Sequence, residues 1–411
     1  MDHRLVCQAC GTEYDPRVDL WVCPTCDPSE SGWLDVQGEL TGLDSTSLPF
    51  GDDGETRDMW RYRDLLPVLT DEPISLGEGW TPLTRLDRIS SWAGVSVRLK
   101  NETVNPTWSF KDRLNALVVS NARAKGYTRI AVSTTGNHGA STAAYARRGG
   151  LNDVIVLLHP ESQRPARIQV RASGAAAVVT DANGRGELLA QLVEQGWYPT
   201  TRTPSMMTGL PYGYEAYKTI AYELVEQTDS LPDAVFVPTG LGDGFYGIWK
   251  GFRELHELGM IDEPPRMIAV QPAEQAPLVA AVQTGTTDVS IPADSPPITI
   301  SSATANVAPH AYRAIVESDG FAVPVERETL EEAIRKTGAD GVFLEPASAL
   351  ATAGPRCAVQ AGHLDGDEEV VAIGTGSGVK WPAHAEPIVG SVPTIEPTVD
   401  ALAEATGMDL G

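Results

Sequence analysis

A lysine in a polar, helix-opening loop is the residue of this chain best suited to do chemistry. Lys111 lies at the centre of "NPTWSFKDR", the stretch from Asn105 to Arg113. A lysine amine attacks a carbonyl carbon only after it has lost its proton, and a partly desolvated pocket favours that loss. The stretch therefore predicts amine chemistry at Lys111, with a surface helix lysine as the alternative.

Three glycine-rich or polar loops follow predicted strands and could share a site with this lysine. They are "STTGNHGAS" (133–141), "PTGLGDGFYG" (238–247) and "GTGSGVK" (374–380). In a parallel sheet the carboxyl ends of the strands meet at one crevice, where ligands bind. A loop that leads into a helix presents free N–H groups and a positive dipole to an anion. We expect two of these loops to bind anionic groups, one of a cofactor and one of a substrate.

The loops and the lysine together favour one cofactor. None of the loops closes with the Gly-Lys-Ser/Thr of a Walker A sequence. A lysine beside an anion cradle is typical of Schiff-base chemistry with pyridoxal 5'-phosphate (PLP), which delocalises a carbanion at the substrate's Cα. Once a substrate has displaced Lys111, the freed amine can move the Cα proton.

Four of the five cysteines form two short pairs near the N-terminus. Cys7 and Cys10 are two residues apart, as are Cys23 and Cys26, and twelve residues separate the pairs. Two such knuckles can deliver four thiolates to one tetrahedral Zn²⁺. The spacing predicts a structural zinc ribbon over residues 1–30, and two redox dithiols are the alternative.

Strand and helix patterns alternate from about residue 95 onward. "TRIAVST" and "DVIVLLHP" are typical of buried strands, whereas "SFKDRLNALVVSNARAKG" has the apolar spacing of a helix. The alternation predicts an α/β fold with two doubly wound parallel-sheet domains beside the small ribbon. The expected boundaries are a large PLP-binding domain from 31–110 and 205–385, a small α/β domain at 111–204, and an acidic tail at 386–411.

Composition limits the partners of this 411-residue chain. The formal net charge is −24 and the pI is about 4.6, so a nucleic acid would be repelled. No stretch approaches the ~20 apolar residues that span a bilayer, and the first residues lack an apolar signal core. We expect a cytoplasmic protein without a membrane or nucleic-acid partner. The acidic surface is interpreted as adaptation to high intracellular salt, with an ordinary acidic enzyme as the alternative.

Several motifs resemble those of a known family. "NPTWSFKDR" is similar to the cofactor-lysine motif of the fold-type II PLP enzymes (the tryptophan synthase beta-like superfamily), and of the threonine synthase family in particular. "GEGWTPL" (77–83), "WKGF", "EPASA" (345–349) and "TGSGVK" also resemble that family's signatures. A four-cysteine ribbon is found in its archaeal members. The resemblance covers residues 70–382 and the ribbon, and it implies a homodimer that acts on a small amino acid.

The resemblance implies roles for individual residues. Lys111 corresponds to the Schiff-base lysine, Asn137 to the residue that contacts the ring hydroxyl, and Thr375 to the residue that faces the pyridine nitrogen. The phosphate loop would be Gly240, Leu241, Gly242, Asp243 and Gly244. The residues expected to face the substrate are Trp108, Ser109, Thr134, Thr135, Gly136 and His138.

Some positions depart from the family pattern. The family has glycine where Trp108 stands, and Thr-Ser where His138 and Gly139 stand. We expect these positions to set substrate choice, with the Trp108 ring near the substrate. Arg113 or Lys380 could then supply the missing anion binding.

Two acidic residues near these motifs are expected to have no part in the chemistry. Asp243, beside a bound phosphate, would be unfavourable unless it faces solvent or pairs with a cation, and solvent is expected. Glu345 is expected to be structural, at the turn before Pro346.

The leading interpretation is a lyase of the threonine synthase kind, which converts O-phosphohomoserine and water to threonine and phosphate. Two alternatives from the same fold are a serine/threonine ammonia-lyase, favoured by the "GNHG" loop, and a β-replacement enzyme similar to cysteate synthase. A catalytically silent paralogue that binds a ligand or partner is a further alternative, and the presence of Lys111, Asn137 and Thr375 argues against it.

Overall fold

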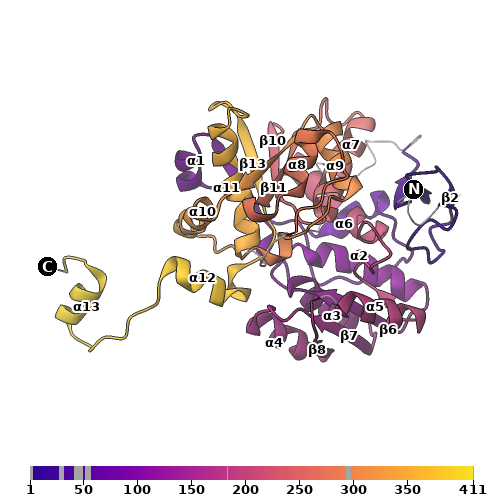
Figure 1. Cartoon of the computed structure of the whole chain (residues 1–411), viewed down its shortest axis with the longest axis horizontal. Helices are drawn as coiled ribbons and strands as arrows, with labels where there is room; N and C mark the ends of the chain where they lie inside the picture. The colour runs from indigo at the N-terminus through magenta and orange to yellow at the C-terminus, as the bar shows by residue number, and fades with distance from the viewer. Residues whose placement is uncertain are drawn as a thin grey trace.

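The computed structural model describes residues 3–26, 32–40, 50, 57–182, 184–292 and 298–410. Over these residues the chain forms three sheets, of six, four and three strands (Figure 1). The two larger sheets form the main body, and the smallest contains the N-terminal cysteines.

The six-stranded sheet has the order β12-β11-β10-β13-β5-β4. Its strands are β4 (Leu83–Arg85), β5 (Ser96–Asn101), β10 (Ala234–Pro238), β11 (Arg266–Pro272), β12 (Phe321–Val325) and β13 (Glu369–Gly374). Five of them are parallel, and β4 pairs antiparallel with β5 at one edge. The prediction of a parallel sheet is confirmed, and the antiparallel edge is an addition to it.

Alternation along β10 gives this sheet two separate cores. Val235 and Val237 pack in the cluster that contains Trp249 of α7, whereas Phe236 packs in the cluster that contains Leu350 of α11. Successive strand residues point to opposite faces, so both faces are covered by helices. These helices are α1 (Asp87–Ala93), α6 (Pro211–Gln227), α7 (Asp243–Glu257), α8 (Pro277–Thr284), α9 (Pro309–Glu317), α10 (Arg327–Ala339) and α11 (Pro346–Gln360).

The four-stranded sheet has the order β8-β7-β6-β9, and its pairs are parallel. Its strands are β6 (Arg129–Thr134), β7 (Asp153–Leu158), β8 (Ala176–Val179) and β9 (Tyr198–Pro199). Its helices are α2 (Lys111–Ala124), α3 (Asn137–Arg148), α4 (Arg164–Ala172) and α5 (Gly184–Glu194). All four strands lie inside the predicted 111–204 segment, and the exact domain boundaries stay a prediction.

The N-terminal sheet is antiparallel and is tied to the body by buried charges. It joins β1 (His3–Cys7) to β2 (Glu13–Tyr14) and to β3 (Leu34–Gly38), which lies beyond the predicted ribbon end at residue 30. Asp35 of β3 forms a 2.8 Å ion pair with Lys250, the lysine of "WKGF", and both side chains are buried. Burying an unpaired charge is costly, so this pair fixes β3 against α7.

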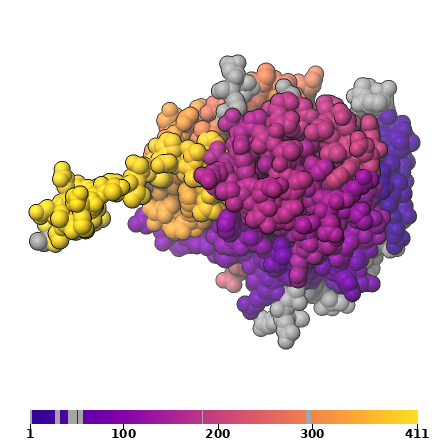
Figure 2. All heavy atoms as spheres, turned by 90° about the horizontal axis from the view of Figure 1, so that it is seen from below, coloured from indigo at the N-terminus to yellow at the C-terminus, as the bar shows by residue number. Residues whose placement is uncertain are grey.

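The C-terminal segment leaves the body. It contains α12 (Pro382–Val389) and α13 (Val399–Thr406), and α13 buries none of its residues. Figures 1 and 2 show this segment extending to one side of the molecule. None of the helices in the described ranges is long and apolar enough to cross a membrane.

Candidate active site

A cavity of about 300 Å³ brings the predicted loops together. It is lined by residues that follow β6, β10 and β13, by segment 300–304, and by Lys111 at the start of α2. The carboxyl ends of parallel strands are where such sites form. A larger cleft of about 770 Å³ between the N-terminal sheet and segment 63–71 contains none of the predicted residues. We therefore place the candidate active site in the smaller cavity.

Lys111 is in a desolvated, aromatic environment. Its Nζ lies 3.1 Å from the Tyr217 hydroxyl and 4.6 Å from the centroid of the Phe110 ring. Burial lowers the pKa of the Lys111 amine, against the opposing charges of Asp243 and Glu345. A lowered pKa increases the fraction of neutral, nucleophilic amine, as the sequence predicted for this position.

The loop at 240–244 forms a tight turn at the start of α7. Gly242 has φ +98°, and a Cβ there would lie 2.4 Å from Ala311 Cβ. A Cβ on Gly244 would lie 2.7 Å from the Phe110 ring, and one on Gly240 would lie 3.1 Å from Ser302 Cα. The glycines therefore let the backbone pack closely, and the first turn of α7 offers N–H groups to an anion. Leu241 lies in the same cavity wall.

Asp243 does not face solvent, and that expectation is wrong. Its Oδ1 lies 3.1 Å from His310 Nε2 and accepts a 3.0 Å hydrogen bond from the Gly209 backbone. Its side chain is only 18% exposed. Burial alone would raise the pKa of Asp243, but the hydrogen bond and charge of His310 hold it below its usual range. The carboxylate is thus held by its own partners beside the loop, the pairing that the sequence analysis gave as the other possibility.

Asn137 and Glu345 face each other across the cavity. The Asn137 amide nitrogen donates to both carboxylate oxygens of Glu345 at 2.9 Å. Asn137 Oδ1 is buried and has no partner among the described residues. Burial raises the pKa of Glu345, against the hydrogen bond from Asn137. Glu345 therefore has a polar role at the site that the sequence analysis did not assign to it.

The loop after β13 is joined to the loop before Lys111. Phe110 N donates to the Thr375 carbonyl at 2.9 Å, Ser377 N donates to the Trp108 carbonyl at 3.0 Å, and Ser109 bridges Gly376. Thr375 Oγ1 lies 2.8 Å from Ser348 Oγ in the cavity wall. These bonds fix the start of α2, and with it the position of Lys111.

Trp108 has a strained backbone and an exposed ring. Its φ is +68°, a left-handed conformation in which glycine is favoured, and its side chain is 46% exposed. Trp108, Ser109 and Gly136 are not among the residues that line the cavity. The expected place of the Trp108 ring beside a substrate stays a prediction.

The Thr134 hydroxyl stabilises the "TTGNHG" loop. Thr134 Oγ1 accepts hydrogen bonds from Gly136 N at 2.9 Å and Gly139 N at 3.1 Å. Thr135 and His138 line the cavity, and His138 Nε2 has no partner among the described residues. Burial lowers the pKa of His138 to about 3, so its imidazole is neutral near pH 7.

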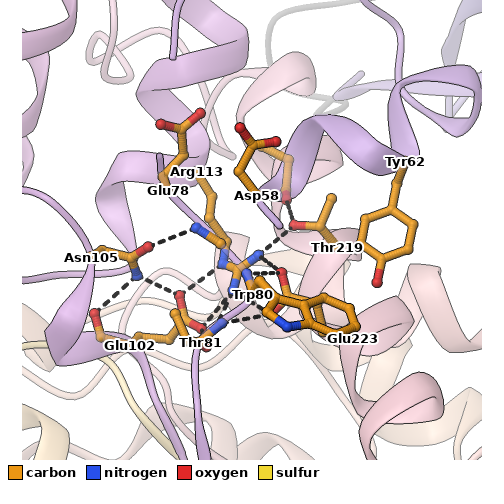
Figure 3. A network of polar contacts seen from close by, with 12 residues as sticks. Asp58, Tyr62, Glu78, Trp80, Thr81, Glu102, Asn105, Arg113, Thr219 and Glu223 are labelled. Carbon is orange, nitrogen blue, oxygen red and sulfur yellow. Dashed lines mark hydrogen bonds and ion pairs between the residues drawn. The ribbon is translucent and has the colours of Figure 1, made fainter. Parts of the chain in front are cut away.

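Arg113 is not available to a substrate, and that expectation is wrong. Its side chain is fully buried and forms ion pairs with Glu102 at 2.8 Å and with Glu223 (Figure 3). Lys380, the other candidate, is also buried and donates to the Thr107 carbonyl. Both cations are bound by other groups of the protein. Arg113 pairs with Glu102 and Glu223, and Lys380 binds the loop before Lys111.

Two arginines that the sequence analysis did not select line the cavity. They are Arg185, in the first turn of α5, and Arg202, just after β9. Arg185 lies between β8 and β9, Arg202 lies after β9, and both are outside every motif. The available signal was their place after strands of a parallel sheet, which is too general to single them out.

The match to a protein family agrees with this geometry. Residues 74–376 match the family described as pyridoxal-phosphate dependent enzyme. The chain belongs to the pyridoxal-phosphate dependent enzyme family. It is 31% identical to a threonine synthase from Methanosarcina acetivorans over 98% of both chains. It is 36% identical to a threonine synthase from Methanocaldococcus jannaschii, over 93% of this chain and 95% of that one. The protein is therefore a PLP-dependent lyase that resembles threonine synthase.

Solved structures include several with a similar fold. An L-serine ammonia-lyase from Rhizomucor miehei superposes with a TM-score of 0.64 at 20% identity, over 75% of this chain and 96% of that one. At that identity the likeness concerns the fold alone.

The residues present fit the family's cofactor. The cavity combines a lysine of lowered pKa, a glycine loop at a helix N-terminus and a buried amide oxygen on Asn137 that has no partner in the described part of the chain. These are the groups that an aldehyde, a phosphate and a polar ring substituent require. Lys111, loop 240–244 and Thr375 would therefore hold PLP in this cavity.

The four N-terminal cysteines converge as a metal site requires. Their sulfur atoms all lie within 4.8 Å of one another. Cys7 and Cys26 are 3.6 Å apart, and Cys10 and Cys23 are 3.7 Å apart. A tetrahedral Zn²⁺ with ~2.3 Å bonds to sulfur needs sulfur atoms about 3.8 Å apart, so this set fits zinc.

Proposed function

We propose that the protein is a threonine synthase, which converts O-phosphohomoserine and water to threonine and inorganic phosphate. The main support is its similarity to threonine synthases over nearly the whole chain, together with a desolvated lysine in the candidate active-site cavity. In this reaction phosphate leaves Cγ, water adds at Cβ, and Cγ becomes a methyl group.

Lys111 would carry PLP at rest and move protons during turnover. When bound, the cofactor delocalises the negative charge that develops on the substrate's Cα. The freed Lys111 amine would take the Cα proton and then a Cβ proton, and protons would return to Cγ, which becomes the methyl group, and finally to Cα. Its burial supports this role, because a lowered pKa lets it act as a base near neutral pH. The Tyr217 hydroxyl, 3.1 Å from Nζ, would orient the amine between these transfers.

The other cavity residues would hold the cofactor and the substrate. The first turn of α7 would bind the cofactor phosphate through its N–H groups. Thr375 would face the ring nitrogen with a hydroxyl, which does not keep that nitrogen protonated and so favours elimination and replacement over transamination. Thr135 and the neutral His138 would receive the substrate's α-carboxylate.

An activity panel tests this proposal. The purified protein, loaded with PLP, is incubated with O-phosphohomoserine, O-phosphoserine, serine and threonine, and the products are measured. We expect threonine and one equivalent of phosphate from O-phosphohomoserine alone, and no product from the Lys111→Ala variant. Turnover of serine or threonine to a keto acid and ammonia, without threonine synthesis, would contradict the proposal.

An ammonia-lyase is the second candidate, and His138 is the observation that favours it. Its neutral ring replaces a hydroxyl that the threonine synthase family has at this position. A β-replacement enzyme similar to cysteate synthase would instead turn over O-phosphoserine in the presence of a second nucleophile. The four-substrate panel separates all three, and a silent paralogue would give no product from any of them.

We further propose that Cys7, Cys10, Cys23 and Cys26 hold one structural Zn²⁺, and that the enzyme is a cytoplasmic homodimer. The sulfur spacing supports the zinc. The excess of acidic residues supports adaptation to high salt, and no nucleic-acid or membrane partner is expected at a net charge of −24.

A further inference from the structure

Two arginines line the cavity beside Lys111 and the glycine loop. Arg185 is the second residue of α5, and Arg202 follows β9, so both belong to the four-stranded sheet's side of the cavity. Across the cavity lie Ser301, Ser302 and Thr304, which add hydroxyl groups to its lining. Cations and hydroxyls together are the groups that bind an anion such as a phosphate.

Neither arginine is neutralised by a carboxylate of the described residues. Arg185 Nε donates to the Ala182 carbonyl at 3.2 Å, and Arg202 donates to the Met206 carbonyl at 3.2 Å. Among the ion pairs of the described residues, neither arginine takes part in one. Burial lowers the pKa of Arg185, and no nearby carboxylate opposes that effect. Arg185 is partly buried and Arg202 is exposed, and both line the one cavity without a carboxylate partner among the described residues.

The position of Arg185 makes the cation more costly. A positive charge in the first turn of a helix is repelled by the helix dipole, and partial burial adds a desolvation cost. The two acidic residues of the cavity do not offset this. Asp243 is bound to His310 and to the Gly209 amide, and Glu345 is bound to Asn137. A bound anionic ligand would offset both costs at once.

We propose that Arg185 and Arg202 form the binding site for the anionic side-chain group of the substrate. The inference rests on the proposed function and deepens it, because it accounts for the phosphate binding that Arg113 and Lys380 cannot provide. It also predicts substrate choice. An amino acid that carries a phosphate or similar dianion on its side chain is bound, whereas serine and threonine leave both arginines unmatched.

The test uses single substitutions in the PLP-loaded enzyme. Arg185→Gln and Arg202→Gln each remove one charge, and Arg202→Lys keeps the charge without the paired donors. Arg148→Gln is the matched control, since Arg148 is an exposed arginine at the end of α3 and lies outside the cavity. The measurements are kcat, KM for O-phosphohomoserine, the inhibition constant of inorganic phosphate, and PLP content from the absorbance spectrum.

Each Gln variant should raise KM and the phosphate inhibition constant roughly 10- to 100-fold, the effect of losing a charged hydrogen bond. PLP content should not change, kcat should change much less than KM, and Arg202→Lys should recover part of the loss. Unchanged KM and inhibition constants would overturn the inference. Loss of PLP from the Gln variants would also overturn it, since the arginines would then serve the cofactor's own phosphate.

The outcome can be separated from the fate of the proposed reaction. If the wild type makes no threonine, inorganic phosphate is titrated against the cofactor's visible spectrum instead. A phosphate-dependent change in the wild-type spectrum that both Gln variants weaken would support the proposed anion-binding site even though the proposed reaction had failed. No effect of phosphate on the wild-type spectrum would overturn the proposed anion-binding site as well.

Discussion

The buried charge network around Arg113 makes a strong prediction about stability. Arg113 is fully buried and pairs with Glu102 and Glu223, while Lys100 lies 2.6 Å from Glu223 (Figure 3). Replacing Arg113 with Met keeps much of the volume but leaves Glu102 without a cation. Removing one partner of a buried ion pair costs about 3–5 kcal/mol. We expect the free energy of unfolding to fall by that amount.

Urea unfolding followed by fluorescence measures this loss, and two variants control it. Arg85→Met removes one partner of an exposed pair, in which Arg85 and Asp87 are 73% and 76% exposed, and should cost at most about 1 kcal/mol. The double variant Arg113→Met with Glu102→Gln should recover part of the loss, since it also removes the unmatched charge. If Arg113→Met unfolds at the same urea concentration as Arg85→Met, the reasoning is wrong.

Three further predictions concern the ribbon and the "TTGNHG" loop. Metal analysis should find one Zn²⁺ per chain in the wild type and less in Cys23→Ser, with PLP binding retained because the ribbon lies outside the cavity; equal zinc in both would remove Cys23 from the site. Gly139→Ser should lower the free energy of unfolding by about 1–3 kcal/mol, because a Cβ there would lie 2.5 Å from Thr134 Cγ2 and 2.6 Å from Val156 Cγ1. A serine variant as stable as the wild type in thermal unfolding would refute this overlap. Since the pKa of His138 falls from 6.5 to about 3 on folding, the unfolded chain binds the extra proton and stability is lost as the pH drops below 6.5. Between pH 7 and pH 5 the wild type should lose about 1–2 kcal/mol more than His138→Gln, and parallel urea curves for the two would argue against a buried neutral ring.

The sequence predicted the parts of this molecule that depend on local pattern. The apolar runs of β6 and β10 identified buried parallel strands, and the rule for the carboxyl ends of such strands brought Lys111, Asn137 and loop 240–244 to one cavity. Cysteine spacing likewise anticipated four converging sulfur atoms. These features follow from periodicity and short spacings, which a sequence displays directly.

What the sequence could not predict depends on contacts between distant segments. Asp243 was expected in solvent because its partner His310 is 67 residues away, and no feature of the nearby sequence indicates that contact. Arg113 was considered for phosphate binding because its partner Glu223 lies 110 residues away. Arg185 and Arg202 belong to no motif, so only the folded cavity shows that they face it. The left-handed backbone of Trp108 is a conformation that favours glycine, and it too depends on the folded loop rather than on a local pattern.

The most direct test of the account is to locate the cofactor on the chain. The protein is loaded with PLP, reduced with borohydride, digested, and mapped by mass spectrometry. We expect a single pyridoxyl-bearing peptide with the label on Lys111, and no label in Lys111→Ala. A protein that takes up no PLP, or one labelled at a different lysine such as Lys380, would contradict the assignment of this cavity as the active site.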